Sequence, residues 1–150
     1  PVIALHGTAD PIVPYQGGVV SRSGYRLPII SEWVAGWAQR NACAPDPNAL
    51  PAAGEVSGVV YPSCNQNAEV IFYTIQGGGH TWPGGTPLPE FITGRTTRDV
   101  DASALMWEFF RATRSTIEQS DMTAVREALY PLINSLWSDR QKSMMIQIMS

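Results

Sequence analysis

Two short apolar stretches have the pattern of strands buried on both faces. Residues 2–5, Val-Ile-Ala-Leu, form an unbroken apolar run that a polar segment follows at once. Residues 69–75 are rich in β-branched and aromatic side chains, which suit the surface of a sheet. A short, wholly apolar run is typical of a strand in a parallel sheet. We therefore predict two core strands over these ranges.

Two other segments have the three-to-four-residue spacing of amphipathic helices. Ile30, Trp33, Val34 and Trp37 predict a helix over 29–41. Asp101 precedes a second apolar repeat and is a good N-cap, which predicts a helix over 102–113. The order strand, helix, strand, helix predicts parallel pairing of the strands through a right-handed crossover.

The remaining segments are less regular. Proline and glycine residues predict a long loop over 6–28, and within 42–68 one stretch, 56–61, fits a strand. From residue 115 the apolar side chains again recur at helical spacing, and Pro131 predicts a division into two helices. This tail has a packed face but no recognisable chemistry.

Composition narrows the class of protein. The 150 residues, with 44% hydrophobic and 15% charged side chains, are typical of a single globular domain. A net charge of −3 and no basic stripe argue against a nucleic-acid partner, and no apolar run is long enough for a membrane span. The sequence opens directly on a strand, without a methionine or signal peptide, which we interpret as a fragment.

Cys43 and Cys64 lie in the irregular segment. Neither belongs to a Cys-x-x-Cys motif or has a neighbouring histidine, which argues against a metal site. We interpret them as a disulfide that restrains this segment, in a protein outside the reducing cytosol. Two buried free thiols are the alternative.

Candidate catalytic residues follow each predicted strand. Asp10 lies in "HGTADPIVPY" after the first strand, and His80 lies in "GGGHTWPGG" after the second. Ligands bind beyond the carboxyl ends of parallel strands, so the two loops predict one site. There the carboxylate can accept a hydrogen bond from one imidazole nitrogen and leave the other to act as a general base.

Each of these residues also has a structural interpretation. Asp10 precedes a proline, a common arrangement in turns. His6 is expected to pack or to hydrogen-bond at the strand end, outside the chemistry. The glycines at 77–79 are either flexible turn material or a means of bringing the backbone close enough to place the imidazole. His6, Asp10 and His80 lack the short spacing of metal ligands, and no motif indicates a cofactor.

Four stretches together resemble the C-terminal half of secreted α/β-hydrolase esterases, the family of polyhydroxybutyrate depolymerases, feruloyl esterases and acetylxylan esterases. They are "HGTADPIVPY", "EWVAGWAQRNAC", "EVIFYTIQGGGHTWPGG" and "TRDVDASALMWEFF". The resemblance covers about residues 1–112. It implies that Asp10 and His80 are the acid and base of a catalytic triad, that Cys43 and Cys64 are bonded, and that Trp82 lies near a substrate subsite. Trp33 and Trp37 are then core residues of their helix.

The nucleophile of that family is missing from these residues. No serine has glycine at both the −2 and +2 positions, as a Gly-x-Ser-x-Gly elbow requires. The expected fold class is therefore α/β, with 1–114 as the C-terminal part of an α/β-hydrolase and 115–150 as a helical tail of unknown role. The expected function is hydrolysis of a polyester or a plant cell-wall polysaccharide ester. The expected partner in this function is the missing N-terminal half of the hydrolase. The alternative is a non-catalytic interaction module whose tail docks onto a partner.

Overall fold

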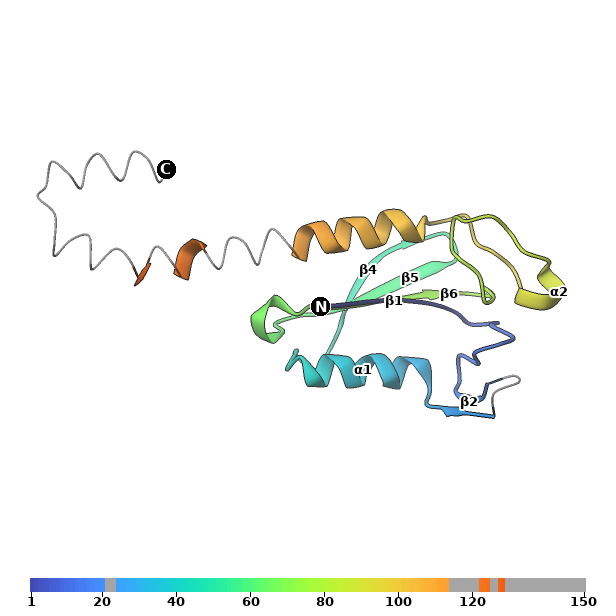
Figure 1. Cartoon of the computed structure of the whole chain (residues 1–150), viewed down its shortest axis with the longest axis horizontal. Helices are drawn as coiled ribbons and strands as arrows, with labels where there is room; N and C mark the ends of the chain where they lie inside the picture. The colour runs from blue at the N-terminus through green and yellow to red at the C-terminus, as the bar shows by residue number, and fades with distance from the viewer. Residues whose placement is uncertain (21–23, 114–121, 125–126, 129–150) are drawn as a thin grey trace, which may run out of the picture. The chain divides into compact units, whose positions relative to one another are not determined.

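A four-stranded sheet organises the first 113 residues of the computed structural model (Figure 1), which describes residues 1–20, 24–113, 122–124 and 127–128. The strands lie in the order β1 (Val2–Gly7), β6 (Val70–Ile75), β5 (Val56–Tyr61) and β4 (Asn48–Ala53). β1 and β6 pair in parallel over their full lengths. β5 pairs with β6, and β4 with β5, in antiparallel orientation.

The fold class expected from the sequence is wrong. We expected a portion of an α/β-hydrolase made of parallel strands with a crossover helix, whereas two of the three pairings in this sheet are antiparallel. The reason is a tight turn after β4, where Gly54 has a φ of 55° and Ala53 pairs with Val56. Residues 48–61 therefore fold back as a hairpin and add to the edge of β6 that faces away from β1.

Helix α1 (Ile30–Arg40) packs on one face of the sheet, as its spacing predicts. Ile30, Val34 and Ala38 are buried and form a core cluster with Val70 and Phe72 of β6. The two tryptophans of α1 differ from the expectation that both are core residues. Trp37 packs against the cluster, but Trp33 is 44% exposed because its position turns it away from the buried stripe.

The predicted helix over 102–113 is confirmed, and Figure 1 shows it on the opposite face of the sheet from α1. Its first turn is capped by Asp101, whose Oδ1 accepts a hydrogen bond from the backbone N–H of Ala104 at 2.9 Å. Ala102 and Phe109 are buried on its inner side. The sheet thus has an apolar layer on both faces.

Short elements connect these layers. The expected loop over 6–28 contains the end of β1 and a small ribbon of β2 (Gly18–Val19) and β3 (Arg26–Leu27). A 3-10 helix, η1 (Asn65–Asn67), precedes β6, and α2 (Glu90–Thr93) follows the glycine-rich loop.

Cys43 and Cys64 form a disulfide. It joins the segment after α1 to the segment before η1 and so closes the base of the β4–β5 hairpin. Such a bond indicates an extracellular or otherwise oxidising compartment. Within the described ranges, none of the helices has the length and apolar character needed to cross a membrane.

The chain divides into two units, Pro1–Thr113 and Arg114–Ser150, and every element named above belongs to the first. In the second, residues 122–124 and 127–128 are helical. The rest of the predicted tail over 115–150, including Pro131, lies outside the described residues.

Candidate active site

The parallel pairing of β1 and β6 brings two loops to one edge of the sheet. Gly7 lies opposite Ile75, so both strands end at the same level. The loop after β1 carries Asp10 and the loop after β6 carries His80, 70 residues further along the chain. The backbone N–H of Thr8 donates to the carbonyl of Ile75, which ties the two loops together at their start.

Asp10 is held in a defined orientation by its own loop. Its side chain is 4% exposed, and its Oδ1 accepts hydrogen bonds from the backbone N–H groups of Ile12 and Val13, each at 2.8 Å. These two hydrogen bonds form the turn that the structural interpretation of Asp10 predicts. It does not exclude chemistry, because it occupies Oδ1 and leaves Oδ2 to face the neighbouring loop.

His80 meets that second oxygen. Its Nδ1 lies 2.9 Å from Oδ2 of Asp10, and since a carboxylate accepts, Nδ1–H is the donor. The imidazole is 49% exposed, and among the described residues no hydrogen-bond partner occupies its Nε2. A histidine fixed through Nδ1–H in this way presents Nε2 as a proton acceptor. The structure thus brings together the two residues that the sequence singled out, and their catalytic role stays a prediction.

The glycine-rich loop before His80 is held by hydrogen bonds of its backbone on both sides. On one side the N–H of Gly77 donates to Oγ1 of Thr8 at 2.8 Å, and the N–H of Ala9 donates to the carbonyl of Gly78 at 3.0 Å. On the other side the N–H of Gly79 donates to the carbonyl of Arg95 at 2.9 Å. These close approaches favour the second interpretation of the glycines, in which they place the imidazole.

We expect Gly79→Ala to lower the free energy of unfolding by about 1–3 kcal/mol, the usual effect of overpacking. A Cβ at this position would lie 2.1 Å from the carbonyl oxygen of Thr93 and 2.5 Å from Cα of Gly94, so the backbone must move. Gly36→Ala is the matched control: a Cβ there meets nothing within 4 Å, and alanine favours α1 by up to about 1 kcal/mol. Urea unfolding measures both, and equal effects would contradict the crowding of the loop.

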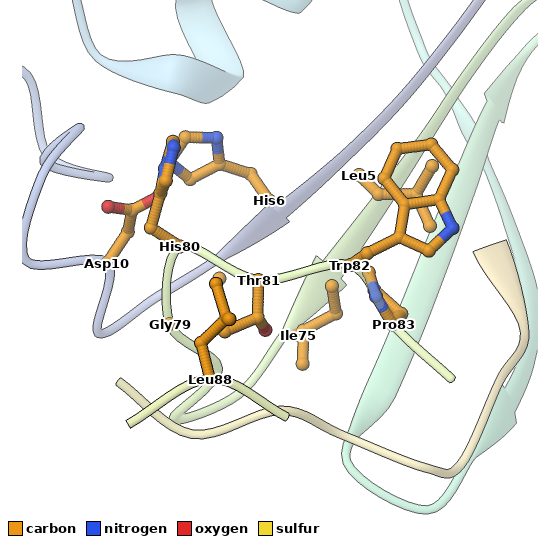
Figure 2. A pocket seen from close by; sticks show the side chains of 11 residues that line it. Leu5, His6, Asp10, Ile75, Gly79, His80, Thr81, Trp82, Pro83 and Leu88 are labelled. Atoms are coloured by element: carbon orange, nitrogen blue, oxygen red, sulfur yellow. The ribbon is translucent and has the colours of Figure 1, made fainter. Parts of the chain in front are cut away.

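A cavity of about 360 Å³ adjoins the Asp10–His80 pair (Figure 2). Its wall includes apolar side chains from β1, β6 and the segment after His80, namely Leu5, Ile75, Trp82, Pro83 and Leu88. Trp82, the expected substrate-binding residue, is 52% exposed, and its indole N–H donates to Oγ of Ser103 at 3.0 Å. The cavity therefore has a titratable side at His80 and an apolar side at Trp82.

Several residues of this wall were not singled out from the sequence, and Thr81, Pro83 and Leu88 are among them. Thr81 and Pro83 flank Trp82 directly, and their place in the "GGGHTWPGG" run was a usable signal. Leu88 had no such signal, because it reaches the cavity only through the fold of the loop before α2.

His6 hydrogen-bonds at the end of β1, in line with the structural interpretation of this residue. Its Nε2 lies 2.9 Å from the carbonyl oxygen of Val13 and 3.6 Å from Oδ2 of Asp10. Both histidines therefore approach the same carboxylate. Even so, the part of the chain that the structure describes contains no group of three or more histidine, cysteine, aspartate or glutamate side chains placed to hold a metal ion.

Comparison with known proteins finds a distant relative. A protein of Nocardia uniformis subsp. tsuyamanensis named "Putative esterase NocK" is 27% identical over 127 residues, covering 73% of this chain and 36% of the relative. The chain thus spans about a third of that relative's length. No family model matches the chain, and no solved structure matches it.

Proposed function

We propose that this chain supplies the acid and the base of a serine-type carboxylic ester hydrolase. The observation that carries the proposal is the contact of 2.9 Å between Nδ1 of His80 and Oδ2 of Asp10 beside a cavity with an apolar wall. The distant relative named as an esterase supports the same reaction class. The nucleophilic serine then comes from outside these 150 residues, since none of the serines here lies in a Gly-x-Ser-x-Gly elbow.

In the proposed reaction, Nε2 of His80 removes the proton of that serine as its oxygen attacks the ester carbonyl. The tetrahedral intermediate collapses when His80 gives the proton to the departing alcohol, and an acyl-enzyme remains. Water then attacks the acyl group, again losing a proton to Nε2, and the same proton returns to the serine as the acid leaves. Asp10 holds the Nδ1–H tautomer throughout and stabilises the imidazolium that forms twice in each cycle.

The substrate class we propose is an ester of a polymer, either a polyhydroxyalkanoate or a feruloylated or acetylated plant polysaccharide. The apolar wall of Leu5, Ile75 and Leu88 suits an uncharged acyl group or alcohol. Trp82 adds an exposed aromatic surface at the cavity mouth, on which an aromatic or sugar ring can stack. We propose that the protein is secreted, which the disulfide supports and which fits a polymer that lies outside the cell.

The isolated chain should not turn over p-nitrophenyl acetate faster than its His80→Ala variant does, because a base without a nucleophile lacks the acyl-enzyme route. A longer chain, extended by the sequence encoded upstream of residue 1, should show turnover that His80→Ala abolishes. Turnover by the isolated chain that depends on His80 would disprove the external nucleophile. Absence of turnover in the longer chain would favour the alternative, a non-catalytic interaction module.

A further inference from the structure

A second imidazole, that of His6, lies beside the Asp10–His80 pair and also lines the cavity. It comes from β1 itself, one residue before the strand ends, and so it has a more rigid support than either loop. Its side chain is 16% exposed, against 49% for His80. Figure 2 shows the rings of His6 and His80 close to each other beside Asp10. The proposed reaction gives His6 no part, so its position calls for an explanation.

The hydrogen bond from His6 fixes its protonation at Nε2. Its partner at 2.9 Å is the carbonyl oxygen of Val13, which only accepts, so Nε2–H must donate. Oδ2 of Asp10 lies further away, at 3.6 Å, beyond a good hydrogen bond. His6 therefore donates its Nε2–H to the backbone of the loop and not to the carboxylate of Asp10.

Val13 is the residue through which this bond reaches Asp10. Its carbonyl accepts from His6, while its own N–H donates to Oδ1 of Asp10 at 2.8 Å. Ile12 donates to the same oxygen, also at 2.8 Å. The orientation of the carboxylate depends on these two N–H groups, and their position depends on how the Val13 end of the loop is held.

The His6 ring is itself restrained. The ring of Tyr15 lies against it, with 5.9 Å between the centroids. The hydroxyl of Tyr15 hydrogen-bonds Oγ1 of Thr74 on β6 at 3.1 Å, and its backbone carbonyl accepts from the N–H of Ile30 at the start of α1. The support of His6 thus extends into both β6 and α1.

We propose that His6 is a positioning residue: by donating Nε2–H to Val13 it locks the loop over 10–13, so that Oδ2 of Asp10 is aimed at Nδ1 of His80. This inference rests on the proposed function, in which the pair holds the base in its Nδ1–H tautomer. His6 touches no reacting atom and acts through Val13 and Asp10.

The experiment reads out the tautomer of His80. If His6 only filled space, replacing its hydrogen-bond donor would not change that tautomer. Two-bond nitrogen–proton NMR correlations on the ¹⁵N-labelled chain at alkaline pH, where imidazole rings are neutral, show which ring nitrogen carries the proton. His6→Phe keeps an aromatic ring against Tyr15 but has no donor, and His6→Gln keeps an N–H donor without the ring. In His6→Phe we expect the ratio of Nδ1–H to Nε2–H at His80 to fall about fivefold, in keeping with the loss of one typical hydrogen bond.

His6→Gln should restore that ratio to within about twofold of the original, since the effect is that of one donated hydrogen bond. An unchanged ratio in His6→Phe, or an equal fall in both variants, would overturn the proposal. The original chain gives a test that needs no variant: His6 must carry its proton on Nε2, and a proton on Nδ1 would overturn it as well.

The two proposals fail in different ways. If His80 in the original chain shows no preference for Nδ1–H, and Asp10→Asn changes nothing, the Asp10–His80 pair and the proposed function fail together. If the preference is present and Asp10→Asn removes it while His6→Phe leaves it intact, only the role of His6 fails.

Discussion

In a longer chain that includes the proposed nucleophile, we expect His80→Ala to lower kcat for p-nitrophenyl acetate by about 10⁶, and Asp10→Asn to lower it by about 10⁴. The first change removes the proton acceptor. The second keeps an oxygen for the N–H groups of Ile12 and Val13 but puts an amide N–H₂ opposite Nδ1–H of His80. The ring must then flip its tautomer or turn away, and either outcome costs the base its function.

Asp46→Asn is the matched control for the loss of a carboxylate, because Asp46 is exposed and lies away from the cavity wall. We expect its kcat and KM to equal those of the unmodified protein. Steady-state kinetics should assign the losses in the other two variants to kcat, since neither side chain is expected to bind the ester in its ground state. A kcat within tenfold of the original in His80→Ala would exclude this histidine as the base.

Removal of the disulfide will lower the free energy of unfolding by about 3 kcal/mol, the size expected from the entropy of a closed loop of this length. The bond between Cys43 and Cys64 spans 21 positions and encloses the β4–β5 hairpin. Without it, the hairpin is held to the rest of the fold by the ladder between β5 and β6 and by contacts of Glu55 at its turn with Asp99 and Arg95. Urea unfolding of the chain with and without a reductant measures the difference.

The Cys43→Ala/Cys64→Ala double variant supplies the control for that measurement. Its stability should match that of the reduced chain and should not respond to reductant. If reduction leaves the unfolding curve of the original chain unchanged, the disulfide contributes nothing to stability and the loop-entropy argument fails.

The helices and strands that could be predicted are those whose type follows from the apolar pattern of their own residues. Val34 and Ala38 lie on one stripe of α1, and the helix predicted over 29–41 forms as Ile30–Arg40. The strand predicted over 69–75 forms as Val70–Ile75, because its β-branched and aromatic side chains suit a sheet covered on both faces. In each of these segments the residues of the segment itself are enough to predict the element.

The β4 strand could not be predicted in the same way. Its sequence, Asn-Ala-Leu-Pro-Ala-Ala, contains no β-branched or aromatic residue, and Pro51 cannot donate to a ladder. The strand forms because it lies at the sheet edge, where a missing donor is tolerated, and its register with β5 shifts between Leu50 and Ala53, next to that proline. Missing β4 meant missing the hairpin and hence the antiparallel half of the sheet.

The candidate site was easier to predict than the fold around it. Asp10 and His80 each follow a recognisable strand, and one parallel pairing, β1 with β6, is enough to bring them together. The antiparallel strands lie beyond β6 and leave that edge unaffected. The support from His6 could not be predicted, since it depends on the path of the loop to Val13.

The crowding around Gly79 divides the cavity into a part that tolerates substitution and a part that does not. A side chain at position 7 would run into the carbonyl of Gly78, and one at position 79 into that of Thr93, so the backbone next to His80 tolerates almost no substitution. Trp82 and Leu88 also line the cavity, and both side chains are more than half exposed, so we expect substitutions there to meet less crowding. Attempts to change the substrate preference of the proposed hydrolase should therefore randomise positions 82 and 88 and leave the glycines untouched.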